Sequence, residues 1–213
     1  MIEPSIKSRP VYGTLAPMPG TFHVIVADGE GALAVADLAK TAPPAFFQEA
    51  SIIYVLAKHP SAKHPSAEHP SAENAAYGEV LRGLGASTLH EGPSIAAVLP
   101  RLKQVLATAR MGTRLYLAGS EGLIGQAMQL AIEAGVDHKS IVSEHRGTLA
   151  RRVQCVHCKG ITEDVTTQPA ICAHCGLTLF VRDHYSRRIA AFQGVCIDAE
   201  EPGVVPPTEE AYP

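Results

Sequence analysis

The chain has 213 residues, a net charge of −3 and 46% hydrophobic residues, proportions that are typical of a water-soluble globular protein. Its acidic balance gives no attraction to nucleic acid or to anionic membranes, and with 5% aromatic residues and no Trp it lacks a base-stacking surface. The longest apolar runs, such as Ile52–Ala57, are too short to span a bilayer. We therefore expect neither nucleic acid nor a membrane as a partner.

The first 21 residues are rich in Pro and Gly and predict an extended N-terminal arm without a secretory signal. This favours a cytoplasmic location. The run 22–27 predicts a β-strand because it is short, apolar and β-branched, and it ends in the turn Asp28–Gly31. A helix is expected over residues 32–41, which completes the first half of a βαβ unit.

A second strand is expected over Ile52–Ala57, where the apolar run does not alternate, as in buried parallel strands. Residues 58–73 follow as a low-complexity loop, with three copies of a His-Pro-Ser-Ala unit. Proline in each copy prevents a continuous helix or a central strand. We interpret this segment as a solvated loop expansion, although a histidine metal tract is an alternative.

The alternation of strands and helices then resumes. Helices are expected over 75–84, over 94–109 with an interruption near Pro100, and over 123–134; strands are expected over 86–89, 113–118 and 140–143. Strands that alternate with helices predict an α/β domain with a doubly wound, mostly parallel sheet over residues 22–150. A small module over residues 151–200 and an extended tail over 201–213 complete the expected organisation.

The small module carries the clearest chemical motif. Cys155 and Cys158 form one Cys-x-x-Cys turn, and thirteen residues later Cys172 and Cys175 form a second. Two such turns that face each other complete a tetrahedral cage of four thiolates, which Zn²⁺ favours in zinc ribbons. We expect these four cysteines to bind a metal and to leave no open coordination position.

The spacing leaves the identity of the metal open. Iron also accepts four thiolates, so a rubredoxin-like redox site is an alternative to structural zinc. Two disulfides are a further alternative, but they would need an oxidising compartment. Cys196 lies outside the motif, in an apolar run, and is expected to be an inert buried thiol.

Two predicted strands end in turns of small residues, Asp28–Gly31 and Ala118–Gly122. Glycine allows backbone N–H groups to approach a phosphate at a helix N-terminus. Neither turn has the spacing of the dinucleotide-binding glycine motif, and acidic residues lie in both. Ordinary strand-to-helix turns and a nucleotide site are both consistent with this pattern.

The order of these motifs resembles the nicotinamide-binding half of the ferredoxin reductase superfamily. The resemblance rests on the first glycine-rich turn, on Ala118-Gly119-Ser120 where the family has a Cys-Gly-Pro-like turn, and on Glu144-His145 where it has Glu beside an aromatic residue. It implies cofactor-binding roles for five residues: Gly29, Gly31, Gly119, Ser120 and Glu144. The family's Cys, Pro and aromatic residue are absent here, and no flavin-binding barrel precedes the first expected strand.

The C-terminal run Cys172–Val195 is similar to the end of the small DmmA-type subunit of bacterial dimethylamine monooxygenase, a four-Cys module followed by a His-x-Ser-Arg-Arg segment. That enzyme is a multi-subunit oxidoreductase of methylated amine catabolism. It uses NADPH and O₂ to convert dimethylamine into methylamine and formaldehyde. The resemblance implies that NADPH and the flavin, iron–sulfur and oxygen-activating iron centres are held by partner reductase and oxygenase subunits, and that this chain has no catalytic residue.

The segment after the second Cys-x-x-Cys turn is expected to form a helix that contacts a partner subunit. Arginine offers a fork of donors suited to carboxylates and is enriched at interfaces. The candidate contact residues are Arg182, His184, Tyr185, Arg187 and Arg188. A solvated helix that packs on the metal module is the alternative.

Four functions are therefore compared. The leading hypothesis is an accessory, non-catalytic subunit that bridges or positions the reductase and oxygenase subunits of an amine monooxygenase. The others are an iron-containing electron relay, a nucleic-acid-binding zinc ribbon, and residual NAD(P) binding at the glycine turns that Gly119→Val would abolish.

Overall fold

The computed structural model describes residues 9–56 and 72–213, so most of the predicted His-Pro-Ser-Ala loop lies outside the described residues. Contacts divide the chain into two compact units. One consists of Tyr12–Gly147, and the other consists of Thr148–Pro213 together with the described residues 9–11. The predicted N-terminal arm is thus shared between the units, because its second half packs on the α/β unit.

A five-stranded, fully parallel sheet forms the centre of the first unit, with the strand order β3-β2-β1-β4-β5. Its strands are β1 (Phe22–Asp28), β2 (Ala50–Val55), β3 (Thr88–Gly92), β4 (Thr113–Gly119) and β5 (Ile141–His145). All residues of β2 are buried, as expected for a central parallel strand without alternation.

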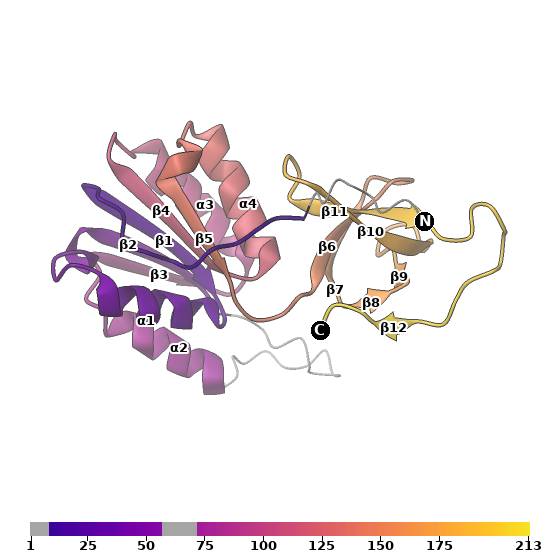
Figure 1. The fold of residues 1–213 in the computed structure, drawn as a ribbon, viewed down its shortest axis with the longest axis horizontal. Helices are drawn as coiled ribbons and strands as arrows, with labels where there is room; N and C mark the ends of the chain where they lie inside the picture. The colour runs from indigo at the N-terminus through magenta and orange to yellow at the C-terminus, as the bar shows by residue number, and fades with distance from the viewer. Residues whose placement is uncertain (1–8, 57–71) are drawn as a thin grey trace. The chain divides into compact units, whose positions relative to one another are not determined.

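Helices cover both faces of this sheet, with α1 and α2 on one face and α3 and α4 on the other (Figure 1). They are α1 (Gly31–Thr41), α2 (Ala72–Arg82), α3 (Ile95–Ala107) and α4 (Glu121–Glu133), and two short 3₁₀ turns are η1 (Phe47–Glu49) and η2 (His138–Ser140). Side chains of β1 alternate between the two hydrophobic cores, Ile25 and Ala27 on one face and Val24 and Val26 on the other. The predicted doubly wound α/β class is confirmed.

One detail of the helical prediction is wrong. Helix α3 continues through Pro100, where an interruption was expected. Ser94 caps its N-terminus by accepting a hydrogen bond from the Ala97 N–H, and Val98, Leu102 and Leu106 bury one face against the sheet. This packing outweighs the one backbone hydrogen bond that proline cannot donate.

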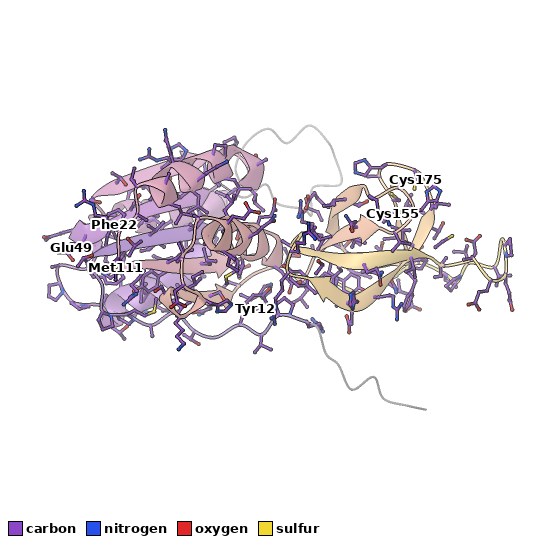
Figure 2. The ribbon with its side chains drawn as sticks, turned by 90° about the horizontal axis from the view of Figure 1, so that it is seen from above. Tyr12, Phe22, Glu49, Met111, Cys155 and Cys175 are labelled. Atoms are coloured by element: carbon purple, nitrogen blue, oxygen red, sulfur yellow. The ribbon has the colours of Figure 1, made fainter. Side chains whose placement is uncertain are left out.

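Residues 12–21, the part of the predicted arm that belongs to this unit, pack along the sheet. The Gly13 N–H donates to the Ser143 carbonyl of β5 at 3.0 Å, and the Met18 N–H donates to the Tyr116 hydroxyl at 3.0 Å. Leu15 is buried in the core beside α1. Because the arm runs the length of the sheet, Tyr12 and Phe22 lie at opposite ends of the unit (Figure 2).

The second unit is built from β-strands. Its main sheet has the order β7-β6-β11-β10-β9, in which β11 and β6 are parallel and the other neighbours are antiparallel. The strands are β6 (Arg151–Cys155), β7 (Ile161–Val165), β9 (Ala170–Ile171), β10 (Thr178–Ser186) and β11 (Ala191–Cys196), and β8 (Thr167–Gln168) pairs separately with β12 (Glu209–Glu210). A four-cysteine cluster lies in this unit, as predicted.

The helix predicted around Arg182–Arg188 is wrong, because this segment belongs to β10 and to the turn that follows it. Leu179 and Val181 are buried and Phe180 and Arg182 are exposed, which is the period-two pattern of a strand. A bulge between Arg182 and Tyr185 breaks this alternation and disguises it in the sequence.

The C-terminal tail returns to its own unit. Strand β12 pairs antiparallel with β8, and the Leu149 N–H donates to the Pro213 oxygen at 2.6 Å.

Within the described residues, no helix has both the length and the apolar character needed to cross a bilayer.

Candidate functional site

The four predicted metal ligands converge at one point of the second unit. Cys155 ends β6, Cys172 follows β9, and Cys158 and Cys175 lie in the turns after them. All four Sγ atoms lie within 4.8 Å of one another. Cys155 and Cys175, which come from different turns, are neighbours (Figure 2).

The dimensions of this cage fit a tetrahedral metal site. The Sγ atoms are 3.8 Å apart in the pair Cys155–Cys175 and 3.7 Å apart in the pair Cys158–Cys172. A tetrahedron with metal–sulfur bonds of about 2.3 Å has edges of about 3.8 Å. The cluster is therefore able to bind a metal, while its geometry does not distinguish zinc from iron.

Both cysteine turns have the same backbone design. The N–H of the residue after each turn, Lys159 or Gly176, donates to the carbonyl of the first cysteine, Cys155 or Cys172, at 3.0 Å. Both residues have positive φ, 63° for Lys159 and 74° for Gly176. This left-handed conformation closes each turn so that its two sulfur atoms face the other turn.

His174 connects the two turns, although it is not one of the four ligands. Its Nε2 atom lies 2.8 Å from the Ile161 carbonyl, and its ring packs on Gly160, where a Cβ atom would overlap the imidazole. His174 therefore fixes the second turn against β7, the strand that follows the first turn.

The thiols of the cage are electrostatically unequal. Burial opposes ionisation of Cys172, but the backbone N–H groups of Cys175 and His174 outweigh it and lower the pKa of the Cys172 thiol to about 6. At Cys175 the hydrogen bond from the Leu177 N–H lowers the pKa of the thiol. Desolvation and the neighbouring cysteine thiols outweigh this bond and raise the pKa to about 12. Ligation of a metal by all four thiolates must therefore displace protons.

The residues that the reductase resemblance singles out lie together at the carboxyl end of the parallel sheet. Gly29 and Gly31 follow β1, Gly119 ends β4, Ser120 follows it, and Glu144 lies near the end of β5. Strands β1, β4 and β5 are neighbours in the sheet. These five residues therefore share one region, in which internal hydrogen bonds occupy the side chains of Ser120 and Glu144.

Asp28 is the central group of this region, although its sequence position predicted only an acidic residue in the turn. Its carboxylate accepts the Ser120 backbone N–H at 2.7 Å and the Ser120 hydroxyl at 2.5 Å. Burial raises the pKa of Asp28, and the two bonds from Ser120 counteract the increase only in part. Ser120 in turn caps α4 by accepting the Leu123 N–H, so Asp28 fixes the start of this helix.

Glu144 is also occupied from within. Its carboxylate accepts the Leu15 N–H at 2.7 Å and the Arg146 Nε–H at 2.7 Å. Beside it, the Tyr12 hydroxyl donates to Glu121 at 2.9 Å, and the Tyr12 ring stacks on His145. The N-terminal arm thus covers the end of β5, a contact that no local sequence signal indicates.

Four of the predicted partner-contact residues are exposed, but the fifth is not. Arg182 and His184 lie on β10, and Arg187 and Arg188 lie in the turn that follows. Tyr185 is buried in the core of this unit, with its ring edge-on to Phe192 at 5.0 Å. The bulge in β10 turns Tyr185 inward, so we leave it out of any contact surface.

A buried arginine in the same unit, Arg151, was not predicted from the sequence. The Arg151 guanidinium lies 4.1 Å from the ring centre of Phe192 and 4.0 Å from that of Tyr212, and it pairs with Asp183 at 2.6 Å. Arg151, Asp183 and Tyr212 border a cavity of about 480 Å³. Because Tyr212 comes from the tail, this stack attaches the tail to the sheet.

Comparison with known proteins agrees with this architecture. A curated relative from Ectopseudomonas mendocina (strain ymp), the heme-dependent oxidative N-demethylase delta subunit, is 38% identical over 122 residues, which cover 55% of this chain and 69% of the relative.

Two solved structures share distant similarity with this chain. The siderophore-interacting protein SipS from Aeromonas hydrophila has 14% identity and a TM-score of 0.39 over 61% of this chain, and the chain covers about half of it, 51%. The FAD/NAD-binding domain of nitric oxide dioxygenase from Vibrio cholerae has 16% identity and a TM-score of 0.38 over 65% of this chain and 56% of that domain. The fold class rests on the strand order and helices described above.

Two family descriptions match successive parts of the sequence, one for each unit. Residues 4–141 match "Dimethylamine monooxygenase subunit DmmA-like, N-terminal domain", and residues 152–195 match the corresponding C-terminal domain. The chain therefore belongs to the dimethylamine monooxygenase subunit DmmA-like family.

Proposed function

We propose that this chain is an accessory subunit of a multi-subunit, NADPH- and O₂-dependent dimethylamine monooxygenase. The overall reaction is (CH₃)₂NH + O₂ + NADPH + H⁺ → CH₃NH₂ + CH₂O + H₂O + NADP⁺. In this proposal the chain bridges or positions the reductase and oxygenase subunits in the cytoplasm and carries no catalytic residue. The observation that carries the proposal is the match of both units, residues 4–141 and 152–195, to the two domains of the family.

The cysteine cage supports a structural role in this assembly. Cys155, Cys158, Cys172 and Cys175 supply four protein ligands, and a site with four protein ligands has no position left for a substrate or water. We propose Zn²⁺ as the bound metal. It would tie the turn after β6 to the turn after β9 and so hold the shape of the β-sheet unit.

The exposed cations of the β10–β11 hairpin are the proposed contact with a partner. We call Arg182, His184, Arg187 and Arg188 the hairpin surface. Across residues 9–56 and 72–213, the ion pairs of the structure include none made by these three arginines. Guanidinium groups without an internal partner suit an acidic protein surface, where they donate paired hydrogen bonds to carboxylates.

Immunoprecipitation from native cells, followed by mass spectrometry, tests this proposal. We expect flavin- and oxygen-dependent oxidoreductase subunits to co-precipitate with the chain in fixed ratios. The double variant Arg187→Glu/Arg188→Glu should lose them, whereas Lys103→Glu/Lys139→Glu, an equal charge change in the other unit, should retain them. Recovery of the wild-type chain alone would refute the proposed function.

An iron-containing electron relay is the second candidate. The observation that favours it is the exposure of Cys158 and Cys175, because exposed ligands shorten the path of an electron to a docked partner. Metal analysis and the visible absorption spectrum of the purified protein separate the two candidates. A colourless protein with one zinc per chain supports the structural role, and one iron with thiolate-to-iron absorption supports the relay.

A further inference from the structure

The strand order places the expected ligand crevice of this fold between β1 and β4. From β1 the chain proceeds to β2 and β3 on one side, and β4 and β5 lie on the other. In open sheets of this kind, ligands bind outside the carboxyl ends of the strands at the point where the order reverses. A nicotinamide dinucleotide in this chain would therefore have to approach the turns after β1 and β4.

An internal carboxylate occupies this point. Asp28, at the end of β1, accepts both the N–H and the hydroxyl of Ser120, the residue that caps α4. A helix N-terminus is a favourable place for an anion such as a phosphate. Here the Asp28 carboxyl group of the protein itself takes this position, and it is 8% exposed to solvent.

The two turns are also in direct contact. A Cβ atom at Gly31 would overlap the Ala118 carbonyl, and one at Gly119 would overlap the Asp28 carboxylate. Gly119 adopts φ +123°, a conformation that is reserved almost entirely for glycine. In this structure both glycines allow the two turns to pack directly against each other.

The end of β5 is closed in the same way. Glu144 is 5% exposed and accepts the Leu15 N–H from the arm, while Tyr12 stacks on His145 and donates to Glu121. A cavity of about 440 Å³ is bordered by Phe22 and Thr88, at the opposite end of the strands.

We infer that the carboxyl end of the sheet is closed by the chain's own side chains and that this subunit binds no nicotinamide dinucleotide. Asp28 is the central residue of the closure. The inference goes beyond the proposed function, since an accessory subunit could bind or not bind a dinucleotide. It requires the NADPH of the complex to bind on another subunit.

Titration of the purified full chain tests the inference directly. NADPH and NADH are each added up to about 1 mM in a calorimeter, a range that detects the weak end of ordinary binding. We expect no saturable heat with either nucleotide. Saturable binding of either one would overturn the inference, while loss of co-precipitating subunits would affect only the proposed function.

Variants of Asp28 test the closure itself. In Asp28→Ala, Ser120 loses both bonds, so the melting temperature should fall by about 3–8 °C, and amide exchange over residues 118–124 should accelerate. Asp28→Asn should lose less, because its amide oxygen still accepts the Ser120 N–H; it also serves if the alanine variant does not fold. Glu30→Ala is the matched control, an exposed acid in the same turn without a capping bond. If Asp28→Ala and Asp28→Asn match this control, Asp28 does not hold the end closed.

Discussion

The cysteine cage and the carboxyl end of the sheet are both made from two turns that face each other, but they differ in what completes them. At the sheet, the Asp28 carboxylate meets the N–H and hydroxyl of Ser120. In the cage, four sulfur atoms face one another at 3.7–3.8 Å in the closest pairs. One pair of turns is joined by an internal hydrogen-bonded carboxyl group, whereas the other brings together four cysteines that are able to bind a metal. Similar local designs can therefore give a closed structural joint or a metal site.

The largest expected effect is at the cage. Cys172→Ser should abolish metal binding and the cooperative melting of the β-sheet unit, since structural zinc contributes about 10–16 kcal/mol in zinc-finger peptides. Metal analysis and circular dichroism melting would measure the two effects. Cys196→Ser is the control, because this thiol lies outside the cage and donates to Asp198, a bond that a serine hydroxyl also makes. Equal metal content in both variants would show that metal binding does not depend on Cys172 and would contradict the proposed four-cysteine site.

The next largest effect is expected at the closed turns. Gly119→Ala combines an unfavourable positive φ with overlap against Asp28 and should cost about 3 kcal/mol or more of unfolding free energy. Gly135→Ala is the control: its φ is +83°, but no atom lies within 4 Å of the added Cβ, so about 1 kcal/mol is expected. Urea unfolding measures both values, and equal costs would mean that the turns have room between them.

A smaller effect tests whether the β-sheet unit has support other than its metal. Arg151→Ala removes a guanidinium that lies between two aromatic rings. Each contact is worth about 0.5–2 kcal/mol, and the mostly exposed Asp183 adds little. We expect a loss of about 2 kcal/mol in urea unfolding, against less than about 0.5 kcal/mol for the exposed Arg187→Ala. No difference between the two would leave the metal as the main support.

The smallest effect concerns pH. Burial raises the folded-state pKa of Asp28 above its unfolded value, so the folded protein binds the proton more tightly. The stability from this group is full below the unfolded pKa and is lost as pH rises through the folded pKa. Asp28→Asn, which cannot ionise, should flatten this part of the stability curve. His145 acts on Asp28 and lowers its pKa, and Asp28 in turn raises the pKa of Tyr54. His145→Gln is the control: it leaves Asp28 able to ionise, so this part of the stability curve should keep its slope.

Features that depend on residues close together in the sequence were predictable. The apolar run at Ile52 predicts a buried strand, and the spacing of the four cysteines predicts a metal-binding cage. The strand at Arg182 was not predictable, because one bulge shifts Tyr185 to the inner face and breaks the alternation. The closure by Asp28 was hidden for a different reason: its partner Ser120 is 92 positions away in the chain, and only the pairing of β1 with β4 brings them together.

The return of the tail has a consequence for handling the protein. Because Pro213 accepts the Leu149 N–H and Tyr212 stacks on Arg151, a purification handle fused after Pro213 would begin within a packed contact. Such a fusion would loosen the same unit whose metal content and partner contacts are to be measured. Untagged protein, recovered with an antibody or by conventional chromatography, therefore gives the cleaner measurement.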